Sequence, residues 1–158
     1  MTRTSLVILA AGGSLALLLG ALAFQHLSGL APCKMCIWQR WPHGVAIGIG
    51  VLVLLVPLGA GAVRLLLGAG LLAALTTAAI GGYHTGVERG WWEGPSSCSS
   101  GSTAGMSTDD LMDQIMSAPL VRCDEVAWQM LGLSMASWNM LASLLLAVFW
   151  VMALRRTA

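Results

Sequence analysis

The chain has 158 residues, of which 57% are hydrophobic and only 9% are charged, and its mean hydropathy is +0.80. Because soluble domains carry roughly 25% charged residues, this composition indicates a membrane protein and excludes an ordinary soluble enzyme. The net charge of +1 gives no basic surface for a nucleic-acid partner. The length fits a single domain, residues 1–158.

Four apolar stretches predict an all-α membrane protein, a bundle of four transmembrane helices in the lipid bilayer. The predicted spans cover about residues 6–25, 37–58, 63–83 and 135–154. The first stretch also fits a secretory signal peptide, but its apolar run is longer than such a segment usually has, so a retained helix is favoured. Glycines that would allow close helix packing recur in the middle spans, at positions 48, 50, 68, 70, 81 and 82.

The second span must start earlier than its uninterrupted apolar run suggests. That run begins only at Gly44 and is too short to cross a bilayer, so we expect the helix to begin near Cys36. This start draws Arg40 into the membrane border, where a charged side chain indicates a functional site.

Two polar loops, about residues 26–36 and 84–134, are predicted on one side of the membrane. All seven acidic residues of the chain lie in the longer loop or at its edge, between His84 and Gly132. Ser107 and Asp110 form a helix-capping pattern there, and an apolar stripe follows at helical spacing, made of Leu111, Met112, Ile115 and Met116. We therefore expect a short amphipathic helix on the membrane surface in this loop.

The cysteines predict the orientation of the chain in the membrane. All four lie in the two loops, at positions 33, 36, 98 and 123, and cysteines in even number suit an oxidising compartment. Both cysteine loops are therefore predicted outside the cytosol and both termini inside it. The arginines without nearby acids, at positions 3, 64, 155 and 156, then lie on the cytosolic side, as positive residues prefer.

Cys33 and Cys36 form a Cys-X-X-Cys pair at the expected start of the second span. Pro32 suits the first turn of a helix, which would place Cys33 where the helix dipole favours a thiolate. Arg40 follows Cys36 by four residues, so both side chains should share one helix face. This pattern indicates a reactive thiol beside an apolar, lipid-accessible cleft.

Cys98 and Cys123 lie in the longer loop and have two interpretations. They could form a structural disulfide, or they could exchange disulfides with the Cys-X-X-Cys pair, with Cys98 accessible to an incoming thiolate. Zinc is a weaker alternative, because His26, His43 and His84 are available but the spacings match no ordinary zinc motif.

Several segments resemble the disulfide bond formation protein B family, DsbB, the quinone-linked thiol oxidases of the Gram-negative inner membrane. The similar segments read "FQH" at 24–26, "PCKMCIWQR" at 32–40, "YHTGVERGWWEGPSSC" ending at Cys98, and "RCDEVAWQMLGLSMASWN" from Arg122. They span most of the chain in the order of the family. The resemblance implies a bacterial inner-membrane enzyme, a protein-disulfide:quinone oxidoreductase that reoxidises a periplasmic DsbA-like thioredoxin-fold protein.

The same resemblance implies a role for each matching residue. Cys98 and Cys123 are expected to oxidise the DsbA-like partner, with Cys98 forming the mixed disulfide and Cys123 passing electrons to Cys33. Cys33 and Cys36 are expected to hand them on to quinone, with ubiquinone favoured over menaquinone. Arg40 is expected to hold the quinone, and His84, which aligns less securely, is a second quinone-binding residue.

Two other functional classes remain open. A vitamin K epoxide reductase-like enzyme also couples quinone to thiols, but in that family the loop cysteines precede the Cys-X-X-Cys pair, and here they follow it. A non-enzymatic membrane scaffold with two structural disulfides would need neither Arg40 at the membrane border nor the Cys-X-X-Cys spacing.

Overall fold

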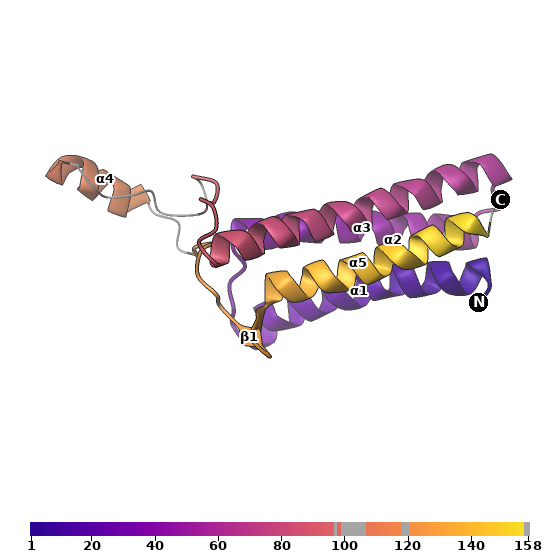
Figure 1. Ribbon diagram of the computed structural model, residues 1–158, viewed down its shortest axis with the longest axis horizontal. Coiled ribbons are helices and arrows are strands. Elements are labelled where there is room, and N and C mark those ends of the chain that lie inside the picture. The colour runs from indigo at the N-terminus through magenta and orange to yellow at the C-terminus, as the bar shows by residue number, and fades with distance from the viewer. Residues whose placement is uncertain (97, 99–106, 118–120, 157–158) are drawn as a thin grey trace.

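The computed structural model describes residues 1–96, 98, 107–117 and 121–156. Four long helices, α1 (Arg3–Leu27), α2 (Lys34–Leu55), α3 (Ala60–Glu88) and α5 (Met135–Arg155), form an elongated bundle (Figure 1). The remaining elements are the short helix α4 (Thr108–Ser117) and a two-stranded antiparallel hairpin, β1 (Gln129–Met130) with β2 (Leu133–Ser134). The prediction of a mostly helical chain is confirmed.

The four long helices pack as a closed ring in the order α1, α2, α3, α5. The buried interior is made of small and aliphatic side chains around Trp150, which is completely buried. Glycines at two crossings permit this packing, because a Cβ at Gly50 would overlap with the Cβ of Ala11, and a Cβ at Gly70 would lie 2.9 Å from the Trp150 ring.

Close packing was expected at six glycines, and two of these expectations are wrong. A Cβ added to Gly48 or Gly68 would meet nothing within 4 Å in the described structure. Gly48 lies on the outer side of α2, away from the face that holds Gly50, and Gly68 lies on the outer side of α3, away from the face that holds Gly70. Residues two positions apart on a helix point in different directions. Of the six, those that do approach a neighbouring helix are Gly50, Gly70, Gly81 and Gly82.

Within the described residues, three helices are long and apolar enough to cross a membrane: α1, α3 and α5. Helix α2 lies in the same bundle and has a comparable length, but its first half carries Gln39, Arg40 and His43. A chain with several such helices is a multi-pass membrane protein. The predicted fourth crossing, by α2, stays a prediction.

Both termini lie at one end of the bundle, and the hairpin lies at the opposite end (Figure 1). The hairpin turns through Leu131 and Gly132, which both have positive φ, and leads directly into α5 through the helix cap Ser134. Helix α4 follows Ser107, as expected, and Figure 1 shows it apart from the bundle. Of the residues predicted for its cap and stripe, the side chains of Asp110, Leu111 and Ile115 lie outside the described ones.

Candidate functional site

Cys33 and Cys36 lie at the first turn of α2, as predicted. Cys33 is the N-cap residue, and its Sγ accepts a hydrogen bond from the backbone N–H of Cys36 at 3.1 Å. The two sulfurs are not bonded and lie 2.7 Å apart, so a small movement would bring them to disulfide distance. The hydrogen bond from Cys33 to Cys36, together with burial, raises the pKa of the Cys33 thiol. Cys33 therefore keeps its proton, so the expected thiolate at Cys33 is wrong, and a single negative charge on the pair belongs on Cys36.

Cys98 and Cys123 form a disulfide, with 5.4 Å between their Cα atoms. The expectation that Cys98 is accessible to an incoming thiolate is wrong for this structure, because Cys98 is only 1% exposed and Cys123 is completely buried. Both pack in a small apolar cluster with Cys33, Met35 and Val87. The backbone N–H of Cys123 also donates to the Cys98 carbonyl, at 2.8 Å, which adds a second link between the two residues.

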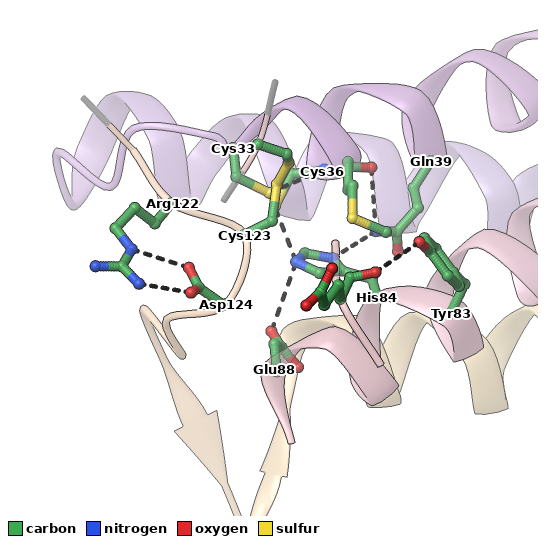
Figure 2. Close-up of a disulfide and its surroundings, with 12 residues drawn as sticks. Cys33, Cys36, Gln39, Tyr83, His84, Glu88, Arg122, Cys123 and Asp124 are labelled. Carbon is green, nitrogen blue, oxygen red and sulfur yellow. Dashed lines mark hydrogen bonds and ion pairs between the residues drawn. A yellow bond between two sulfur atoms is a disulfide. The ribbon is translucent and has the colours of Figure 1, made fainter. Parts of the chain in front are cut away.

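His84 lies beside Cys33 and Cys123, with Glu88 on the other side of its ring (Figure 2). Its Nε2 is 3.6 Å from the Cys33 Sγ, and its Nδ1 is 3.0 Å from the Gln39 Nε2. The Cys33 Sγ, a ring nitrogen of His84 and the Cys123 Sγ all lie within 4.8 Å of one another. The two cysteine pairs, which are far apart in the sequence, thus meet at one point. Metal ions bind thiolates, so this group could hold one only after the Cys98–Cys123 disulfide was reduced.

An apolar pocket of about 340 Å³ opens beside this point, between α1, α2 and α5. Of the four cysteines, all of which the structure describes, Cys36 lines it. Arg40 lines it as well, which confirms that the two residues share one face of α2. The Arg40 Nη1 donates to the Gln25 Oε1 at 2.6 Å, whereas the buried Arg40 Nε has no hydrogen-bond partner among the described residues.

A polar network that was not predicted crosses the bundle interior, and three of its four members line this pocket. Its members, from three helices, are Gln39, His43, Thr77 and Asn139. Thr77 is 0% exposed and His43 is 4% exposed. Hydrogen bonds of 3.3 Å or less join all four residues. The available signal was the presence of such polar side chains inside apolar stretches, where they are costly and mark functional positions.

Glu88 is a second buried residue without a predicted role. Its side chain is 6% exposed and its Oε1 lies 3.8 Å from the His84 Nε2, while its Oε2 has no partner among the described residues. A polar cavity of about 310 Å³ adjoins it, lined also by Arg89 and Ser134. No role for Glu88 and no pairing with His84 was predicted from the sequence. The two residues lie four positions apart on one helix, a spacing that would have allowed the pair to be predicted.

Comparison with known proteins places this geometry in a family. A family profile described as "Disulfide bond formation protein DsbB" matches residues 3–153. The chain belongs to the DsbB family. Members of this family are disulfide-forming oxidoreductases of the membrane, which agrees with two cysteine pairs at one end of an apolar bundle.

Individual relatives cover most of both chains. The disulfide bond formation protein B of Pasteurella multocida (strain Pm70) is 36% identical over 90% of this chain and 84% of its own. That of Azoarcus sp. (strain BH72) is 33% identical, over 89% and 87%, and that of Stutzerimonas stutzeri (strain A1501) is 31% identical, over 96% and 94%. No solved structure gave a significant match to the chain.

Proposed function

We propose that this DsbB family member reoxidises a DsbA-like dithiol protein in the periplasm and delivers the electrons to a membrane quinone. Electrons enter at the Cys98–Cys123 disulfide, move to the Cys33–Cys36 pair, and leave at Cys36. Sustained disulfide bond formation in the periplasm is the result. All four cysteines are catalytic in this proposal.

The meeting of the two cysteine pairs carries this proposal. Cys33 and Cys123 have their sulfurs within 4.8 Å, so exchange between the pairs needs little movement. When a partner thiolate attacks Cys98, Cys123 is the leaving thiolate, and it lies beside the sulfur that it attacks next. Attack on Cys33 in its disulfide with Cys36 then releases Cys36, the cysteine that lines the apolar pocket.

The pocket suits a quinone in size and in polarity. Its lining is mostly apolar, and the buried Arg40 Nε offers one hydrogen-bond donor without a partner in the described structure. A carbonyl oxygen would satisfy that donor, and the charge of Arg40 also stabilises a thiolate at Cys36. His84 lines the same pocket from α3 and completes the set of residues proposed to bind quinone.

The energetics favour quinone as the acceptor. DsbA is a strong oxidant, with a reduction potential of about −120 mV, and each 30 mV corresponds to about 1.4 kcal/mol for a two-electron couple. Protein disulfides of similar potential could not oxidise reduced DsbA to completion. A quinone pool that is continually reoxidised keeps the reaction moving. Ubiquinone is proposed before menaquinone because it is the more oxidising of the two.

We place the protein in the bacterial inner membrane as one domain with four crossings, α2 being the fourth. Helix α2 lies alongside α1 and α3 within the bundle, and its Gln39 and His43 side chains belong to the interior network rather than facing lipid. Both termini are proposed to be cytoplasmic, at the bundle end that holds Arg3, Arg64, Arg155 and Arg156. The hairpin, both cysteine pairs and α4 then face the periplasm, with α4 on the membrane surface.

Two cysteine variants test the order of the relay. Cys123→Ser should accumulate a mixed disulfide between Cys98 and the DsbA-like partner, because the thiol that resolves it is gone. Cys36→Ser should accumulate a bridge between Cys33 and Cys123. Non-reducing gels and peptide mass mapping identify both species.

The double variant Cys98→Ser/Cys123→Ser is the matched control and should form no mixed disulfide with the partner. If Cys36→Ser retained full quinone-dependent turnover, electrons would not leave through Cys36, and the proposed function would have to be given up.

A further inference from the structure

One side-chain amide fixes the hydrogen-bonding direction of the interior network. The Gln39 side chain reaches the backbone carbonyl of Met35 at 3.2 Å, and a carbonyl can only accept. The Gln39 atom in this bond is therefore the NH₂ group, and its Oε1 is an acceptor. Asn139 accordingly turns its NH₂ group to the Gln39 Oε1, at 2.7 Å, and to the Thr77 Oγ1, at 3.1 Å.

This orientation sets the tautomer of His43. The Asn139 Oδ1 faces the His43 Nε2 at 2.9 Å, and since an amide oxygen can only accept, the Nε2 must carry the proton. A neutral His43 then has a bare lone pair at its Nδ1. That atom is buried and has no hydrogen-bond partner among the described residues.

His43 belongs to the wall of the apolar pocket. The ring is 4% exposed and lines the pocket together with Cys36 and Arg40. It follows Arg40 by three residues on α2, so the two side chains are neighbours on one helix face, with His43 about 4.5 Å deeper along the helix axis. Gln39, His84 and Asn139 also line the pocket, but among its lining residues Arg40 and His43 hold the buried polar atoms without a partner in the described structure: a donor at the Arg40 Nε and an acceptor at the His43 Nδ1.

An acceptor distinguishes the two redox forms of a quinone. The oxidised form has carbonyl oxygens that only accept, while the hydroquinone has hydroxyl groups that donate. We propose that His43 binds the hydroquinone selectively, its Nδ1 accepting a hydrogen bond from the hydroxyl that lies farther from Cys36. This inference rests on the proposed function and adds a residue that tunes the acceptor.

The chemistry balances without a further reactant. The Cys33 and Cys36 thiols give up two electrons and two protons as their disulfide forms, and these convert one quinone to one hydroquinone. The hydrogen bond to His43 transfers no net proton. Because it stabilises the reduced form alone, it raises the potential of the bound couple and makes oxidation of a dithiol more favourable.

Binding to a protein that cannot react tests the inference. In the full-length Cys33→Ser/Cys36→Ser variant, the affinities of decylubiquinone and its hydroquinone are measured separately by quenching of tryptophan fluorescence. Adding His43→Leu should weaken hydroquinone binding about tenfold, equivalent to about 30 mV for a two-electron couple, and change quinone binding less than threefold. The control His26→Leu makes the same substitution at an exposed histidine outside the pocket and should change neither affinity.

Each outcome decides something different. Equal losses for the two forms, or no loss, would overturn the role of His43 while leaving the quinone site in place. If the thiol-free protein with His43 intact bound neither form, the proposed quinone site itself would be wrong, and this inference with it.

A measurement on unsubstituted His43 guards against misfolding of the variant. With ¹⁵N-labelled histidine, the His43 Nδ1 should resonate as an unprotonated nitrogen in the free protein. In the Cys33→Ser/Cys36→Ser protein, its signal should move toward that of a hydrogen-bonded acceptor nitrogen when decylubiquinone hydroquinone is added, and should not move in that direction when the quinone is added. A protonated Nδ1 in the free protein would overturn the inference.

Discussion

Arg40 carries a charge at the predicted membrane border, so its loss has a specific expected effect. One guanidinium N–H is bound to Gln25, and the buried Nε is left for a ligand in the pocket. Arg40→Met should leave disulfide exchange with a DsbA-like partner intact but weaken quinone binding about tenfold to a hundredfold. That range corresponds to one hydrogen bond to a charged group, about 1.5 to 3 kcal/mol. Turnover as a function of quinone concentration measures it.

Lys34→Met is the matched control for Arg40→Met, because it removes the other positive charge near the start of the same helix from an exposed position. Its quinone dependence should equal that of the unsubstituted protein. Equal quinone dependence in both variants would show that Arg40 does not bind the acceptor.

At the scale of residues, the sequence predicts those that follow a local rule. Cys36 and Arg40 lie about one helical turn apart, so spacing alone placed them on one face. Gln39, His43 and Asn139 have roles that depend on contacts between α2 and α5, and no local pattern contains that information. The burial of Cys98 was missed for the same reason, since Met35 and Val87 cover it from distant parts of the chain.

At the scale of elements, the α1–α2 crossing depends on one glycine. A Cβ at Gly50 would overlap with Ala11, so Gly50→Ala must push the two helices apart. Overpacking of this kind typically costs about 1 to 3 kcal/mol, only partly offset by the higher helix propensity of alanine, about 1 kcal/mol. We expect Gly50→Ala to lower the midpoint of thermal unfolding in detergent.

Gly48 provides an internal comparison on the same helix. Gly48→Ala makes the same chemical change where a Cβ meets nothing within 4 Å in the described structure, so its midpoint should stay level or rise. Equal midpoints for the two variants would show that the crossing does not depend on close approach at Gly50.

The helices themselves were predictable because length and hydropathy decide them, and the positions of α1, α3 and α5 agree with the predicted spans. The hairpin of β1 and β2 was not predicted. Each strand has only two paired residues, which is too short for a periodic pattern of side chains. The turn also needs a positive φ at Leu131, and a leucine gives no sequence signal for that conformation. Helix α5 holds the hairpin in place, since its Trp138 side chain donates a hydrogen bond to the Met130 carbonyl.

At the scale of the whole molecule, the two ends of the bundle should face different compartments. We expect Glu93→Cys, in a protein otherwise free of cysteine, to react with a membrane-impermeant maleimide in intact cells. Ala62→Cys, at an exposed position near the opposite end, should react only after the membrane is permeabilised. The reverse pattern would invert the proposed topology, and labelling of both sites in intact cells would contradict an odd number of crossings between them.

The burial of the Cys98–Cys123 disulfide has a consequence for leakage. A small thiol such as glutathione meets no exposed sulfur there, so its reaction must wait for spontaneous opening of the apolar cover around Val87 and Val121. A protein partner can supply binding energy to that opening, and a small molecule cannot. If the protein acts as proposed, its disulfide is thereby protected from small thiols and reacts only with a protein whose surface binds this end of the bundle.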